Sequence, residues 1–237
     1  MSPLPTAAPS RPGRRHADLL ISVVSLLLLL AWDASGWDLA TAHLFGTGSG
    51  FAWRDAFITS TVLHNGGRAF AWLLLGGQLW AALRPAAPGG PSRAERWRWM
   101  GVILLCLLAV PTLKQFSPTS CPWDLAEFGG IARYVSHWHL GVSDGGSGRC
   151  FPSGHAVAAF AFFALYFMWR GHDPRPARLW LLTVLGLGLS FGVAQLVRGA
   201  HFPSHTAWSA WLCWVICAAA AALLPRPGQR PVAIAAD

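Results

Sequence analysis

Two histidines and an arginine lie close together in the stretch RGAHFPSH, residues 198–205. His201 and His205 are four positions apart, so on a helix they would share one face. One imidazole can attack a substrate while a neighbouring imidazole orients it and fixes its tautomer. The cation of Arg198 suits an anionic substrate whose negative charge grows in the transition state. The stretch therefore favours nucleophilic catalysis on an anion.

A metal site is an alternative use of the same histidines. Imidazoles at this spacing can ligate zinc, and His137 and His139 from an earlier connection would have to complete the set. Because the sequence clusters no third ligand beside His201 and His205, we expect no metal. We also expect no haem, because a bis-histidine haem needs histidines at similar depth on facing helices, whereas these lie near the ends of apolar stretches.

A second group of polar residues lies in the stretch RCFPSGHA, just before an apolar run. Ser153 is typical of a helix start, and capping alone would account for it. Capping does not account for Arg149 and His155 on either side. A helix N-terminus with a hydroxyl, free N–H groups and a nearby cation binds anions. We therefore expect Arg149, Ser153 and Gly154 to bind an anion and His155 to deliver a proton to it.

The composition points to a membrane protein. Hydrophobic residues make up 54% of the 237 residues and charged residues only 12%, and 14 tryptophans stand against two tyrosines. Indole suits the bilayer interface because it combines a large apolar body with one polar N–H. We predict an all-α, polytopic membrane helical bundle of about six transmembrane helices with an outward-facing active site. The helices are expected near residues 19–32, 69–83, 99–113, 155–169, 179–197 and 206–224.

The basic residues indicate how this bundle is oriented. Arginines precede the first apolar stretch, follow the last, and fill the second-to-third and fourth-to-fifth connections, so these segments should face the cytoplasm. We expect one membrane domain over residues 18–224, with flexible cytoplasmic tails at 1–17 and 225–237, in a bacterial inner (plasma) membrane with a periplasmic active site. The net charge of +8 then reflects topology and anionic lipid, and no nucleic-acid partner is expected.

Six cations lie on the outer side, against this bias, and are therefore candidates for function: Arg54, Arg68, Lys114, Arg133, Arg149 and Arg198. The first outer connection is broken by glycines, and we expect no more in it than a short amphipathic helix near residues 52–64.

Two of the five cysteines lie in the second outer connection. Cys121 and Cys150 are flanked by polar residues in a compartment where disulfides persist, so we predict a disulfide between them, with two independent thiols as the alternative. The other three, Cys106, Cys213 and Cys217, fall within apolar stretches and are expected to be small buried hydrophobic residues.

The stretches PSGH and GAHFPSH resemble the second and third signature motifs of the type 2 phosphatidic acid phosphatases, the membrane members of the vanadium haloperoxidase-like superfamily. The resemblance implies that His201 is the nucleophile that takes the phosphoryl group and that His155 protonates the leaving oxygen. It also implies that Ser153 and the Gly154 N–H form part of a phosphate cradle and that Lys114 is the lysine of the first motif. No metal is implied.

The sequence departs from the family at two arginines. The family has Arg-Pro seven residues after the first-motif lysine, where this chain has Cys121 and then proline, and we expect Arg149 to substitute. The family has a second arginine six positions before the nucleophile, where this chain has Gln195. Arg198 is about one helical turn further on and is the expected replacement.

A third departure concerns the aspartate that orients the nucleophile in the family, which is His205 here, with Asp124 as a candidate helper. A neutral imidazole can still accept the nucleophile's N–H. The resemblance therefore implies a divergent lipid phosphatase that releases phosphate from a lipid phosphate or diphosphate through a phosphohistidine. A lipid phosphotransferase would use the same residues. An intramembrane serine protease with Ser153 as nucleophile is a weaker alternative, because it leaves the outer cations unexplained.

Overall fold

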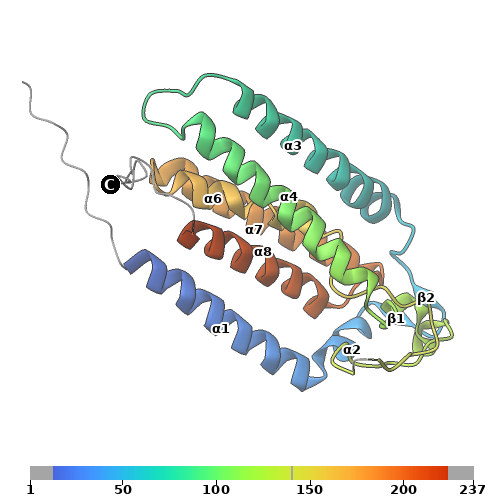
Figure 1. Ribbon diagram of the computed structural model, residues 1–237. Helices are drawn as coiled ribbons and strands as arrows, with labels where there is room; N and C mark the ends of the chain where they lie inside the picture. Colours follow the sequence, from blue (N-terminus) through green and yellow to red (C-terminus); the bar gives the residue numbers. More distant parts are fainter. Residues whose placement is uncertain (1–12, 140, 224–237) are drawn as a thin grey trace, which may run out of the picture.

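A computed structural model describes residues 13–139 and 141–223 and consists of a bundle of helices. The main helices run side by side, with the two ends of the described chain at the same end of the bundle (Figure 1). The chain is 67% helical with almost no strand, which confirms the prediction of an all-α membrane bundle. Four helices are long and apolar enough to cross a membrane: α1 (Gly13–Ser35), α4 (Arg93–Gln115), α7 (Pro174–Val197) and α8 (Pro203–Leu223).

The two other expected spans are helical but shorter or interrupted. Helix α3 covers Gly67–Leu83 and is continued on its N-terminal side by a π-helix, η1 (Phe57–Gly66), where the sequence predicted a short amphipathic helix. The expected span at 155–169 is divided into α5 (Val157–Phe160) and α6 (Phe163–Trp169). The count of six transmembrane helices therefore stays a prediction.

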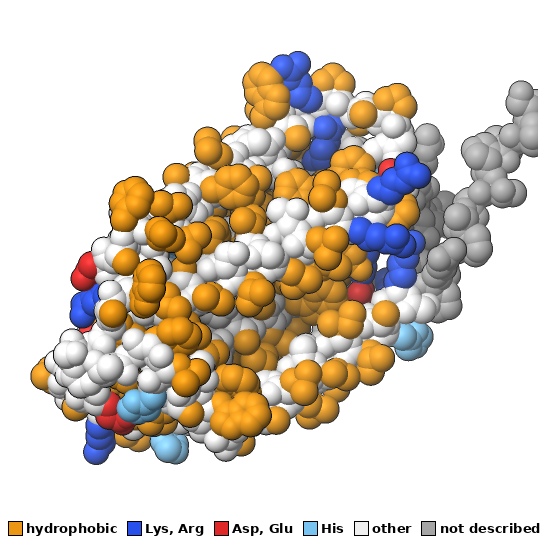
Figure 2. Space-filling view, turned by 180° about the vertical axis from the view of Figure 1, so that it is seen from behind, with side chains coloured by type: hydrophobic (Ala, Val, Ile, Leu, Met, Phe, Trp, Pro, Cys, Tyr) orange, Lys and Arg blue, Asp and Glu red, His pale blue; other side chains and the backbone are white. Residues whose placement is uncertain are grey.

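Most of the core lies between α4, α5, α6, α7 and α8. Its largest members are aromatic, and they include Trp99, Phe160, Phe163, Phe167 and Trp214. The faces that turn away from this core are also apolar, for example Leu28 of α1 and Leu182 of α7, whose side chains are exposed. Figure 2 shows hydrophobic side chains over most of the visible face of the bundle. Such a surface is stable only when lipid covers it, as expected of membrane-spanning helices.

The end of the bundle that carries the chain termini is held by polar contacts. The Arg170 guanidinium donates two hydrogen bonds of 2.7 Å to the Asp18 carboxylate, which joins α1 to the end of α6. Arg14 and Arg15 donate to the backbone carbonyls of Arg170 and Ala222. Residues 13–17, which were expected to belong to a tail, therefore begin α1, and the rest of both expected tails lies outside the described residues.

A compact cap covers the opposite end. It contains α2 (Trp37–Ala42), the two-residue strands β1 (Gly46–Thr47) and β2 (Gly50–Phe51), which pair antiparallel, and the short 3-10 helices η2 (Pro122–Asp124) and η3 (Ala126–Phe128). Phe51, Leu125, Phe128 and Phe202 form a second, smaller core inside the cap. Because Phe202 directly follows His201, this core anchors the stretch that carries the candidate nucleophile.

Candidate active site

A cavity of about 300 Å³ lies where the helical bundle meets the cap. The stretches that the sequence singled out meet there, because the end of α4, the segment before α5 and the connection from α7 to α8 all contribute to its wall. The lining residues are His64, Arg68, Lys114, Cys121, Trp123, Gly154, His155, Ala158, Gln195, Ala200 and His201.

His201 lies in a tight turn between α7 and α8. The Gln195 carbonyl accepts hydrogen bonds from the Ala200 N–H at 2.8 Å and the His201 N–H at 3.3 Å. Gly199 has a φ of 70°, and a Cβ there would lie 2.3 Å from the Phe51 ring. Only glycine fits this position, because the backbone is left-handed and the cap packs directly against it. The turn thus holds the His201 ring at the cavity wall.

His205 lies behind His201, in the first turns of α8. The Nδ1 atoms of the two rings are 3.5 Å apart, so one ring donates and the other accepts. When His201 donates its Nδ1–H to His205, its Nε2 carries the free lone pair. Burial, and then the nearby Lys114 ammonium, lower the pKa of His201 well below its usual 6.5. His201 is therefore a neutral imidazole at pH 7, which is the form that a nucleophile requires.

A disulfide joins Cys121 to Cys150 beside His201. The Cys150 sulfur lies 3.4 Å from His201 Nδ1, and since a disulfide sulfur carries no proton it is only a weak acceptor in this contact. Backbone hydrogen bonds from Arg149 to the Ser117 carbonyl and from Cys150 to the Thr119 carbonyl support the same segment. The disulfide therefore holds the connection before α5 against the turn that carries His201.

The PSGH segment enters the site between these elements. Its Ser153 N–H donates to the His205 carbonyl at 3.0 Å, and its hydroxyl accepts from the Ala156 N–H at 3.4 Å, as in a helix cap. Ser153 is completely buried and does not line the cavity. Gly154 does line it, and a Cβ at Gly154 would lie 3.8 Å from the Lys114 Nζ. The ammonium of the candidate first motif thus lies directly over the candidate cradle of the second.

His155 projects into the cavity from the turn before α5, outside the membrane-spanning helices. Its ring lies between Phe191, at a centroid distance of 5.0 Å, and His64, at 4.4 Å. Among the described residues, neither ring nitrogen of His155 has a hydrogen-bond partner. Burial, and then the neighbouring His64, lower its pKa to about 4. An anion bound in the cavity would raise this pKa again, because it would favour the protonated ring.

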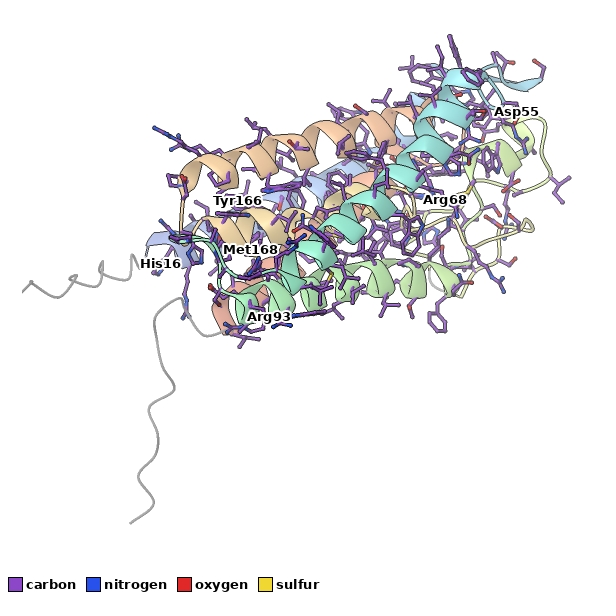
Figure 3. All side chains as sticks on the ribbon, turned by 90° about the horizontal axis from the view of Figure 1, so that it is seen from above. His16, Asp55, Arg68, Arg93, Tyr166 and Met168 are labelled. Carbon is purple, nitrogen blue, oxygen red and sulfur yellow. A yellow bond between two sulfur atoms is a disulfide. The ribbon has the colours of Figure 1, made fainter. Side chains whose placement is uncertain are left out.

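Two cavity residues, His64 and Arg68, were not predicted to act together at the site. His64 comes from η1 and its Nδ1 lies 2.9 Å from the Gln195 amide nitrogen. Arg68 follows one turn later, at the start of α3 (Figure 3). The sequence did mark Arg68 as one of the outer cations that run against the cytoplasmic bias of basic residues. His64 lies in a connection broken by glycines, and nothing in the sequence there indicates that it lies near the other site residues.

Besides Ser153, His205 and Cys150, three further predicted site residues lie outside the cavity wall. Arg149 is exposed, and its backbone is left-handed with a φ of 55°. Asp124 accepts from the Ser147 hydroxyl at 3.0 Å, at the cap surface. Arg198 is buried, and its Nε donates to the Arg54 carbonyl at 2.8 Å, while one terminal nitrogen has no partner among the described residues. The expectation that Arg149 substitutes for the family arginine therefore stays a prediction, and Arg149 is not among the residues that line the cavity.

Side chains that could ligate a metal occur in two groups within the described residues. The first combines His201 with the two disulfide cysteines, which offer no thiolate. The second contains Asp33, Asp38 and His137, and here Asp33 Oδ2 accepts from the indoles of Trp138 and Trp208, as well as lying 3.3 Å from His137 Nε2. These hydrogen bonds explain the second group as a structural anchor for the cap. His139 is exposed and belongs to neither group.

A family model described as PAP2 superfamily matches residues 96–228, which is more than half of the chain. The match begins inside α4 and includes α5 to α8, so it covers Lys114, the PSGH segment and the turn with His201. It does not cover η1 and α3, which contribute His64 and Arg68. No curated protein and no solved structure matches the chain.

Proposed function

We propose that this chain, which belongs to the PAP2 superfamily, is a membrane-embedded phosphatase that releases phosphate from a lipid phosphate or diphosphate. One observation carries the proposal: His201, His155 and Lys114 line a single cavity, and His205 lies 3.5 Å behind the nucleophile. A nucleophile with an orienting partner, a proton donor and a cation are the groups that phosphoryl transfer requires. Superfamily membership independently supports phosphatase-type activity.

Binding of the phosphate group would rest on positive charge and on backbone N–H groups. Lys114 lies over Gly154, so an anion in the cavity would contact both the ammonium and the Gly154 N–H. Arg68 lines the same cavity. The free terminal nitrogen of Arg198 adds positive potential from behind the wall. Together these groups would hold the phosphate oxygens and stabilise the charge that develops on them.

The reaction would proceed in two steps. His201 Nε2 attacks phosphorus, a nitrogen–phosphorus bond forms, and the bond from phosphorus to the lipid oxygen breaks as His155 donates its proton to that oxygen. His205 accepts the Nδ1–H of His201 and so holds the attacking tautomer, although a neutral imidazole brings no negative charge to the phosphorylated ring as a carboxylate would. Water then attacks phosphorus, His155 takes up the water's proton, and phosphate leaves with His201 restored.

The surface of the bundle supports a lipid substrate and an outward-facing site. Apolar side chains cover the helices, while Lys and Arg gather near the end that carries the chain termini (Figure 2). The cavity lies at the opposite end. By the bias of basic residues toward the cytoplasm, both termini would be cytoplasmic and the site would face the periplasm of a bacterial inner membrane. A lipid phosphate in the outer leaflet presents its head group at that depth.

A panel of lipid phosphates tests the proposal. Detergent-purified wild type, His201→Ala and the control His139→Ala are incubated with isoprenoid diphosphate, phosphatidic acid and phosphatidylglycerol phosphate, and both free phosphate and phosphorylated lipid products are measured. We expect phosphate release by wild type and by His139→Ala and none by His201→Ala. Undiminished turnover by His201→Ala would refute the assignment, and phosphorylated lipid without free phosphate would identify a phosphotransferase. Since Ser153 is buried outside the cavity, no observation favours a serine protease.

A further inference from the structure

The cavity contains one imidazole that none of the three family-like motifs supplies. His64 comes from η1, a ten-residue π-helix, and lies outside residues 96–228, the segment that the family model matches. π-helical turns occur frequently at functional sites, where they redirect a side chain. His64 faces the same cavity as His155, His201 and Lys114.

Close packing of glycine fixes the position of η1. A Cβ at Gly67, the first residue of α3, would lie 2.7 Å from the Phe191 ring. Only glycine therefore lets the junction between η1 and α3 contact α7 at this distance. The same Phe191 ring packs on His155 at a centroid distance of 5.0 Å. His64 is thus held by the same packing that holds the candidate acid.

A single hydrogen bond sets the tautomer of His64. Gln195 is 2% exposed, and its side-chain nitrogen lies 2.9 Å from His64 Nδ1. An amide nitrogen only donates, so His64 Nδ1 accepts and the neutral ring carries its proton on Nε2. The main-chain carbonyl of Gln195 accepts the backbone N–H of His201, as the carbonyl of any residue at this position would. The side chain that replaces a family arginine therefore orients an N–H donor in the cavity.

The close contact between the His64 and His155 rings limits the charge of the pair. The ring centroids are 4.4 Å apart and the planes differ by 35°. Two imidazolium ions at this distance repel, so the pair holds at most one proton until an anion enters. The other charged groups that influence His64 are Arg68, Lys114 and Arg198, and all three are cations. At the two positions where the family has arginines, this chain has the uncharged Cys121 and Gln195. The site therefore lacks N–H donors for the phosphate that the family has, and His64 supplies one.

We propose that His64 is a further catalytic residue of this site: its Nε2–H, oriented by Gln195, donates to a phosphoryl oxygen, and its ring, in contact with His155, controls the protonation of His155. This inference rests on the proposed function for the identity of the substrate. His64, on η1, thus takes the donor role of a missing family arginine, although η1 lies outside residues 96–228. Gln195 is a positioning residue in this arrangement, because it acts through His64.

Three variants test the inference, with orthovanadate as the probe for the phosphoryl site. His64→Phe keeps an aromatic ring against His155 but loses the N–H, and His64→Gln keeps an N–H near the position of Nε2. Asn65→Ala is the matched control, because Asn65 is the next residue of η1, is exposed and does not line the cavity. Orthovanadate affinity is measured by calorimetry on detergent-purified protein, and kcat and KM are measured with the lipid phosphate that wild type hydrolyses best.

We expect His64→Phe to weaken orthovanadate binding and lower kcat/KM by about 10- to 100-fold, as expected for loss of a hydrogen bond to a charged group. His64→Gln should recover most of the affinity. In both variants the alkaline limb of the kcat profile should move to higher pH, because removing a repelling neighbour raises the pKa of His155. A purely structural role for His64 would not shift this limb.

Wild-type affinity and an unshifted pH limb in His64→Phe would overturn the inference, as would a wild type that binds no orthovanadate. If His64→Phe does not fold, the alkaline limb of the kcat profile of His64→Gln tests the inference, and an unshifted limb would overturn it. Failure of the proposed function is distinguishable: wild type would bind orthovanadate, with His64→Phe weaker, yet release no phosphate from any lipid. Active wild type with unaffected His64 variants would instead retain the function and remove the role of His64.

Discussion

Removing the disulfide between Cys121 and Cys150 should affect both stability and turnover. The cysteines are 29 residues apart in the sequence. In the chain-entropy model a loop of this length stabilises the folded state by about 3.6 kcal/mol, because the cross-link restricts the unfolded chain. The Cys150 sulfur also packs 3.4 Å from His201 Nδ1, so its loss loosens the nucleophile's ring. Misplacement of a reacting group by about 1 Å costs on the order of 100-fold in rate.

The double variant Cys121→Ser/Cys150→Ser and the reduced wild type are the two perturbations. Unfolding is followed in mixed SDS and dodecylmaltoside micelles, and kcat is measured on the lipid phosphate that wild type hydrolyses. The double variant treated with reductant is the control, since it has no disulfide to lose. Backbone hydrogen bonds at Arg149 and Cys150 remain, so we expect weakened rather than abolished folding. Unchanged stability and unchanged kcat after complete reduction would refute the role assigned to the disulfide.

Three further predictions concern charge and anchoring. Lys114→Met should lower kcat/KM by about 100- to 1,000-fold, as expected for loss of one group that donates to the transition state, and the variant should still fold. Activity within about 3-fold of wild type would exclude Lys114 from the site. The pKa of His201 lies well below 6.5 in the folded protein, so its contribution to stability is fully present above pH 6.5 and is lost as the pH falls below that value. The free energy of unfolding is measured as a function of pH. A free energy that rises on acidification would contradict the burial of His201 as a neutral ring. Asp38→Ala removes the acceptor for the Ser204 N–H and the Trp32 indole and should destabilise the cap by about 3 kcal/mol, measured by micelle unfolding against Asp55→Ala as control.

The sequence predicted much of the bundle because lipid-facing helices must be apolar over their whole length. The apolar stretches near 19–32, 99–113, 179–197 and 206–224 correspond to α1, α4, α7 and α8. The stretch at 155–169 was equally apolar but divides after Phe160 into α5 and α6. Hydropathy reports burial in lipid and carries no information about such a local break.

The candidate site was predictable where the chemistry lies in contiguous motifs. The nearness of His201 and His205 follows from their spacing, and the pairing of Cys121 with Cys150 was expected from their compartment. The position of Arg149 was not predictable, because it depends on one left-handed residue in an irregular loop.

Two other features depend on tertiary packing. The Arg198 guanidinium is held by the Arg54 carbonyl, 144 residues away in the sequence. His64 reaches the cavity only through the π-helical register of η1 and the contact of Gly67 with Phe191. Neither contact leaves a periodic or spacing signal in the sequence.

The central claim is that His201 carries the phosphoryl group, and direct detection of the phosphorylated histidine tests it. Wild type, His201→Ala and His205→Ala are mixed with lipid phosphate, quenched in alkali, where phosphohistidine survives, and digested for mass spectrometry. We predict a phosphoryl group on His201 in wild type, a smaller amount in His205→Ala and none in His201→Ala. Phosphorylation of another residue, or turnover of lipid phosphate by His201→Ala at the wild-type rate, would contradict the account.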